Sequence, residues 1–227
     1  MFLIWQANPM LVDMYRERAG RLGFLDEPLN ACSNFAFVLA TIYAIRFLYI
    51  NKVGDRVSWT LALLPTLIAL GSFAFHTIPN RSTMWGDMIP IAAFQCCMIW
   101  EFSRRLLRAN RQFAAAIMFA MLVFCGVLFP LHSILNGSLF YMPNLLLMLG
   151  FSVLWAWRME REPYLLLMGT CLFVVAISAR TVDWLVPWSQ GTHFLWHIAN
   201  GAMVYILFRA CVLLRKESIL SRQLGEQ

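Results

Sequence analysis

Three histidines in this sequence have the residue type and spacing of a metal site. His193 and His197 are four residues apart, so on a helix both imidazoles lie on one face and can bind one ion. His76 is remote in the sequence, with Ser72 one helical turn before it and Asp87 shortly after it. Three imidazoles with a nearby carboxylate form the ligand set of a catalytic zinc that keeps one position open for water. The pattern predicts a metallohydrolase.

Each of these residues also has other interpretations. Two histidines at this spacing can ligate haem or hydrogen-bond to neighbouring helices, and without a glutamate between them they do not form an HExxH motif. Ser72 can bond the carbonyl four residues earlier, or it can bond a metal water or a substrate carbonyl oxygen. A Ser–His hydrolase lacks an evident orienting acid. Asp87 can transfer protons, cap a helix or support a histidine N–H.

The composition places these residues in a membrane protein. Of the 227 residues, 60% are hydrophobic and 13% are charged, whereas a soluble domain carries about 25% charged residues. The net charge of +6 comes from basic residues in short loops, which membrane topology explains better than nucleic-acid binding. The apolar start, Met1–Trp5, lacks a basic region, so we expect no cleavable signal peptide.

Seven stretches of the sequence have the roughly 20 largely apolar residues that a spanning helix needs. They cover 29–50, 57–77, 84–103, 112–131, 139–157, 164–180 and 192–214. Short loops join them, so consecutive helices run antiparallel. We expect one domain over 1–227, an all-α integral membrane protein with a seven-transmembrane-helix bundle. The six cysteines fall within the spans without a pairing pattern, and we interpret them as buried apolar side chains.

Basic residues set the expected orientation. Of the eighteen lysines and arginines, most lie on the side of the first, third and fifth loops and the C-terminus. These are Arg46, Lys52, Arg56, Arg104, Arg105, Arg108, Arg111, Arg158, Arg161, Arg209, Arg215, Lys216 and Arg222. Since positively charged loops stay inside, we expect the segment 1–28 outside and the tail 215–227 in the cytoplasm. The histidines and Asp87 then meet at the extracytoplasmic face of a cell membrane (the inner membrane in a bacterium), where ionisable groups are usually functional.

Carboxylates are concentrated in the outer segment. They are Asp13, Glu17, Asp26 and Glu27. Oxygen ligands of this kind suit calcium, but the same residues can pair with the arginines beside them. Further along the chain, the spacing of Arg180 and Asp183 predicts a local ion pair.

These motifs resemble the alkaline ceramidase family, part of the CREST superfamily of seven-helix membrane hydrolases. The shared motifs are Ser72-x3-His76, Asp87-Met-Ile-Pro90, His193-x3-His197, Tyr15-Arg-Glu17 and Glu27-Pro-Leu-Asn30-x2-Ser33-Asn34. The resemblance covers nearly the whole chain. It implies zinc bound by the three histidines, with Ser72 stabilising the oxyanion and Asp87 moving protons. Family members cleave the amide of ceramides to a sphingoid base and a fatty acid.

The resemblance also implies a calcium site, with Glu17, Glu27 and the Tyr15 carbonyl as ligands. The family's acidic ligand before the aromatic is Met14 here, with Asp13 one residue displaced, and its asparagine ligand is Ala19. A family disulfide joins the residue after the aromatic to the sixth loop. Here that residue is Arg16, and 181–191 contains no cysteine. Both halves of the disulfide are therefore missing together.

The expected substrate is a ceramide-like membrane lipid that enters from the outer leaflet, as in sphingolipid metabolism. No obligate protein partner is evident. The alternatives are a phospholipase or another lipid hydrolase of the superfamily, a seven-helix receptor or sensor with structural zinc, and a haem-binding electron carrier. Receptors of the superfamily have long N-terminal domains, which this sequence lacks before its first apolar stretch.

Overall fold

The computed structural model describes residues 14–21, 23–131 and 134–225, and every regular element among them is a helix. The helices are α2 (Pro28–Ser33), α3 (Phe35–Asn51), α4 (Arg56–Thr77), α5 (Arg81–Glu101), the π-helix η2 (Phe102–Leu106), α6 (Arg111–Leu128), the 3-10 helices η3 (Phe129–Leu131) and η4 (Ile134–Tyr141), α7 (Met142–Arg158), α8 (Leu165–Thr181) and α9 (His193–Gly225). The prediction of an all-helical fold is confirmed for these residues. Helix α9 continues through most of the segment 215–227 that was expected to be a tail.

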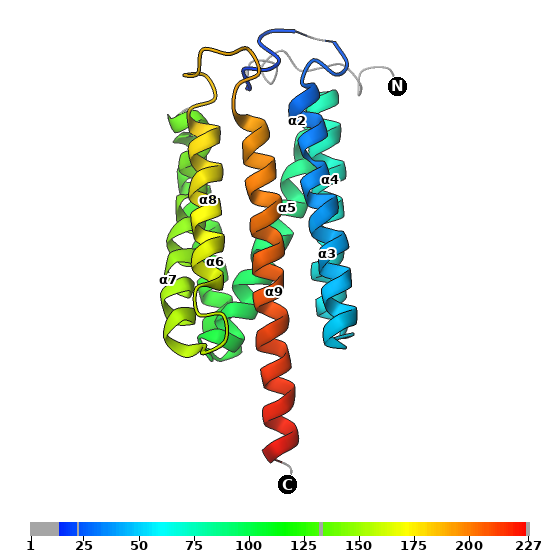
Figure 1. Cartoon of the computed structure of the whole chain (residues 1–227). Coiled ribbons are helices and arrows are strands. Elements are labelled where there is room, and N and C mark those ends of the chain that lie inside the picture. The colour runs from blue at the N-terminus through cyan, green and yellow to red at the C-terminus, as the bar shows by residue number, and fades with distance from the viewer. Residues whose placement is uncertain (1–13, 22, 132–133, 226–227) are drawn as a thin grey trace.

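Helix α9 lies at the centre of the bundle. It packs against α8 on one side and against α3 and α4 on the other, and it also contacts α5. Figure 1 shows α9 between these groups, with its C-terminal turns extending past the other helices. The contact with α3 depends on Gly201, because a Cβ there would lie 2.7 Å from the Cβ of Ala36. This close approach needs glycine.

Several helices are suited to lipid, as expected of a multi-pass membrane protein. Five segments are long and apolar enough to cross a membrane: Pro28–Asn51, Arg56–Thr77, Arg111–Leu131, Ile134–Arg158 and His193–Glu217. Phe119, Val127 and Val153 face outward and are 67%, 66% and 66% exposed, which a soluble surface rarely permits for so many apolar side chains. Helix α8 is apolar but shorter, and α5 carries Asp87 and Glu101.

Helix caps fix the ends near which the site residues lie. The Asn80 side chain accepts the N–H of Thr83, and the Thr83 hydroxyl accepts the Asn80 N–H, so these two residues form a capping box at the start of α5. Asp87 therefore does not cap this helix. Asp55 caps α4 by accepting the backbone N–H groups of Val57 and Ser58.

All six cysteines are free. Cys125 and Cys211 are buried, as predicted, whereas Cys32 and Cys171 are exposed. The prediction of uniform burial was wrong for these two, because their faces of α2 and α8 point outward rather than into the bundle. Apolar composition alone does not distinguish an inward face from one directed at lipid.

Candidate metal centre

His76, His193 and His197 meet inside the bundle. His76 lies in the last turn of α4, and the other two lie in the first turns of α9. All three are buried, and one ligand atom from each lies within 4.8 Å of the others. The predicted convergence of these side chains is confirmed, and the group can hold one metal ion.

Two of the imidazoles are oriented by partners on their Nδ1 atoms. A Glu27 carboxylate oxygen lies 2.6 Å from Nδ1 of His76. The Ser33 hydroxyl lies 2.7 Å from Nδ1 of His197. These contacts leave Nε2 of both rings for a metal, because a partner on one ring nitrogen fixes the tautomer and the ring orientation. The donor set and its orientation therefore fit a metal ion.

His193 is positioned by its backbone and by an aromatic ring. Its N–H and that of Thr192 donate to Oδ1 of Asp183 at 2.8 and 2.6 Å, which caps the start of α9. The ring stacks on Tyr15 with centroids 3.7 Å apart, and its buried Nδ1 has no hydrogen-bond partner among the described residues. The predicted ion pair between Arg180 and Asp183 was wrong, because the second Asp183 oxygen accepts the N–H of Arg16.

Glu27 is held by a buried arginine as well as by His76. Nε of Arg18 donates to Oε1 of Glu27 at 2.6 Å, and Nη2 donates to the His76 carbonyl at 2.8 Å. The Asn30 amide donates to Oε2 of Glu27 at 3.0 Å. Burial alone would raise the pKa of Glu27, but its interaction with His76 and the hydrogen bonds from Arg18 and Asn30 lower the pKa below its ordinary value. Glu27 is therefore an anion, and it supports His76 in this ionised form.

Glu17 has a different role. Its carboxylate accepts the backbone N–H groups of Leu29 and Asn30 at 2.7 and 2.8 Å, at the start of α2. Burial raises the pKa of Glu17, and these two hydrogen bonds only partly offset that rise. Neither Glu17 nor Glu27 has a carboxylate free of protein donors, and the predicted ligand Asp13 lies outside the described residues. Calcium binding stays a prediction, which these contacts do not support.

Ser72 and Asp87 are brought together by a close helix crossing. A Cβ on Gly71 would lie 2.0 Å from the carbonyl oxygen of Gly86, so α4 and α5 touch along their backbones one residue before each side chain. The Ser72 hydroxyl lies 3.5 Å from Nε2 of His197, the nitrogen that is free for metal. One Asp87 oxygen is buried and has no hydrogen-bond partner among the described residues. Both side chains are available for chemistry beside the histidines.

These groups border a cavity of about 570 Å³. Its polar wall contains Ser72, Asp87, His193, His197 and Arg180, and most of the remaining wall is aromatic or aliphatic. This volume lies within the range of roughly 300–1,000 Å³ that is typical of ligand pockets. The site can therefore accommodate a ligand with a long apolar part and a polar group near the histidines.

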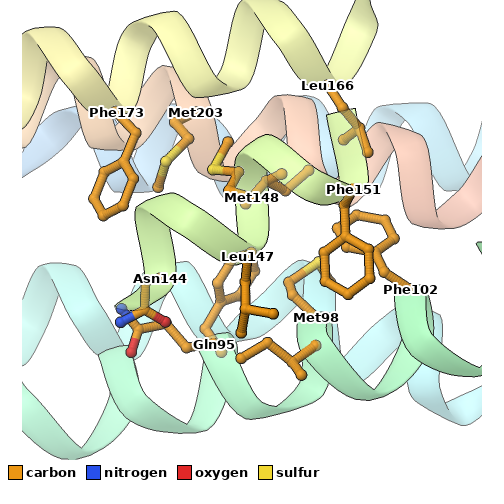
Figure 2. Close-up of a pocket in the computed structure, with 13 residues that line it drawn as sticks. Gln95, Met98, Phe102, Asn144, Leu147, Met148, Phe151, Leu166, Phe173 and Met203 are labelled. Atoms are coloured by element: carbon orange, nitrogen blue, oxygen red, sulfur yellow. The ribbon is translucent and has the colours of Figure 1, made fainter. Parts of the chain in front are cut away.

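A second cavity, of about 70 Å³, lies deeper in the bundle. Phenylalanine, methionine and leucine side chains from α5, α7, α8 and α9 line it, and Figure 2 shows the polar ends of Gln95 and Asn144 at one end. On α5, the lining shifts from Ile91 in the large cavity to Phe94 in the small one, which is one helical turn further along.

No protein-family model matches the sequence, and no curated protein matches it. The resemblance to alkaline ceramidases therefore stays a prediction that depends on the motif residues.

Sequence reasoning missed Ser33 and Arg18 as supports of the histidines, and it assigned Glu27 to calcium instead. The available signal was the position of Glu27 and Ser33 at the N-terminal end of the first apolar stretch, level with His76 and His197. Sequence reasoning also missed that Arg180 lines the cavity, because Asp183, three residues later, was expected to form an ion pair with it.

Proposed function

We propose that this chain is a zinc-dependent amidohydrolase of the alkaline ceramidase type that cleaves the amide of ceramide-like membrane lipids. The convergence of three buried imidazoles, two of which border one large cavity together with Ser72 and Asp87, supports this proposal. Three neutral nitrogen ligands suit zinc, and an open fourth position is characteristic of catalytic sites.

The residues have separate roles in this reaction. His76, His193 and His197 would hold a divalent ion, which would supply a Lewis acid and make a water molecule a better nucleophile. The Ser72 hydroxyl donates a hydrogen bond to the carbonyl oxygen as negative charge develops on it. Asp87 accepts the proton that the attacking water loses, and then donates it to the amide nitrogen as the C–N bond breaks. The products are a free amine and a fatty acid.

The apolar wall of the large cavity suits the acyl chain of such a lipid. Because the amide must lie near the histidines, the chain extends along Ile91 of α5 toward the smaller cavity below it. Methionine and phenylalanine side chains adapt to a flexible apolar chain, although they also serve as ordinary packing. We propose that the lipid enters laterally from the outer leaflet.

We also propose that α5 and α8 cross the membrane, which gives seven spans with the site at the extracytoplasmic face. The excess of basic residues at the opposite ends of the helices supports this orientation. Trp188 is exposed in the connection between α8 and α9. In a cysteine-free background, Trp188→Cys should react with an impermeant thiol reagent in intact cells. Arg161→Cys should react only after permeabilisation. The reverse pattern would overturn the orientation.

Metal content and turnover of purified variants test the enzymatic proposal. We expect about one zinc per chain, and loss of both zinc and amidase activity in His193→Ala. Asp87→Asn should keep the zinc but lose about 10²–10⁴-fold in turnover, because it removes the proton-transfer group and no ligand. Arg161→Gln, at an exposed side chain, is the control and should change neither quantity. Ceramide cleavage by metal-free protein would overturn the proposal, and a panel of ester and amide lipids separates it from a phospholipase or a receptor without turnover.

A further inference from the structure

Arg180 is a cation placed in the wall of the large cavity. It lies near the end of α8, and its side chain lines the same cavity as Ser72, Asp87 and the histidines of α9. Nε donates to the Asn136 carbonyl at 3.1 Å, and Nη1 donates to the Tyr15 hydroxyl at 2.8 Å. The described residues provide no hydrogen-bond acceptor for Nη2. Part of the guanidinium fork therefore remains available to a ligand.

The charge of Arg180 has no ionic partner in the described part of the chain. No carboxylate oxygen there lies within 4.0 Å of it, and Asp183 is engaged by backbone N–H groups instead. The guanidinium carbon lies over the rings of Tyr15, Trp196 and Tyr141, at 5.3, 5.6 and 5.8 Å from their centroids. These rings stabilise a cation and hold the fork in place, but they do not neutralise it. The carboxylate of Asp87 lines the same cavity but makes no ion pair with Arg180 within 4.0 Å. The enclosed guanidinium can therefore still attract an anion that reaches it directly.

Tyr15 links this cation to the metal centre. Its hydroxyl accepts from Arg180, and its ring stacks on His193 with centroids 3.7 Å apart. A group bound at Arg180 is therefore close to the position that the scissile amide must take beside the histidines.

We propose that Arg180 and the Tyr15 hydroxyl form a subsite for an anionic group of the substrate, so that the preferred substrates are acidic lipid amides rather than neutral ceramides. That such a lipid is cleaved rests on the proposed amidohydrolase function. The binding preference for an anionic lipid does not require turnover. The fork of Arg180 recognises a carboxylate or a phosphate oxygen next to the amide.

Binding to metal-free protein tests the subsite without interference from zinc, which itself attracts anions. The probes are N-lauroylglycine and N-lauroylglycinamide, which differ in one terminal atom and in charge, and calorimetry in one detergent measures both affinities. We expect the acid to bind about 10- to 100-fold more tightly than the amide, as for a charge-assisted hydrogen bond. In Arg180→Gln this ratio should fall toward one, and in Arg180→Lys it should be intermediate. Arg161→Gln should keep the wild-type ratio.

Equal affinity of wild-type protein for the two probes would overturn the subsite, as would an undiminished ratio in Arg180→Gln. If Arg180→Gln does not fold, the wild-type ratio and the Arg180→Lys ratio decide the question. An Arg180-dependent preference without amide cleavage by the zinc-loaded protein would overturn the proposed function and leave the subsite standing. Cleavage of neutral and acidic amides with equal efficiency would overturn the subsite alone.

Discussion

Replacing Glu27 by glutamine tests how the metal centre is held together. The two carboxylate oxygens of Glu27 accept from different donors, Nε of Arg18 and Nδ1 of His76, each at 2.6 Å. In glutamine, one of these positions becomes an NH₂ group, which can only donate. Because a guanidinium cannot lose its proton, the amide oxygen must face Arg18 and the NH₂ must face His76. The substitution therefore changes which proton the imidazole can carry.

The expected effect is a loss of metal affinity of about 10- to 100-fold, the range for removing a partner of a metal-binding histidine. An NH₂ group opposite Nδ1 requires that nitrogen to accept, so the ring proton moves to Nε2, which is the nitrogen directed at the metal. Binding must then reverse this tautomer against the hydrogen bond. The charge-assisted bond that is lost contributes about 1.5–3 kcal/mol, which is of the same size.

Competition with a chelator of known affinity measures this change in purified protein. Glu17→Gln is the matched control, because Glu17 is a buried glutamate in the same segment whose carboxylate accepts from Leu29 and Asn30 and not from a histidine. It should leave zinc affinity unchanged. An unchanged affinity in Glu27→Gln, or an equal loss in both variants, would refute the tautomer argument. Equal loss of calcium binding in both variants would instead support the calcium prediction.

Two further predictions concern α4, the helix that carries Ser72 and His76. Gly71→Ala should lower the free energy of unfolding by about 1–3 kcal/mol or more and reduce activity, because the added Cβ would meet the Gly86 carbonyl. Gly86→Ala is the control and should be tolerated, because a Cβ there meets nothing within 4 Å. At the other end of α4, burial would raise the pKa of Asp55, but hydrogen bonds from Ser58 and the charge of Arg215 lower it. This carboxylate therefore stabilises the fold above its ordinary pKa of about 3.9, and that contribution is lost as the pH falls through the lowered value. The difference in melting temperature between wild type and Asp55→Asn should shrink from pH 7 to pH 3. A difference that stays constant over this range would contradict a stabilising role of the ionised Asp55 carboxylate.

The parts of the site that the sequence predicts are those set by helical periodicity and membrane depth. His193 and His197 share a face because they are four residues apart, and the end of an apolar stretch places His76 at the same level. Neither rule specifies how a helix is rotated about its axis. The contacts of Ser33 and Arg180 depend on that rotation, and it is set by packing such as the Gly71–Gly86 crossing.

The chain between α6 and α7 shows a second limit. The sequence predicts a helix from residue 139, whereas η4 begins at Ile134 and includes left-handed backbone at Leu135, Asn136 and Gly137. Only Asn and Gly adopt that conformation readily, so the backbone of Leu135 is strained. The turn directs the Asn136 carbonyl at Arg180. Local propensity therefore predicts where the turn lies but not that its carbonyl accepts a hydrogen bond from Arg180.

The role of Glu27 shows why residue type alone does not determine a metal site. A carboxylate-rich segment favours calcium, but in the folded chain the cation next to Glu27 is the guanidinium of Arg18, whose side chain is fully buried. A calcium ion on Glu27 would displace that guanidinium and leave it without its partner in a buried position, which costs several kcal/mol. It would also compete with His76 for the same oxygens. In this chain Glu27 therefore connects the buried guanidinium of Arg18 to His76, and its negative charge orients a candidate metal ligand.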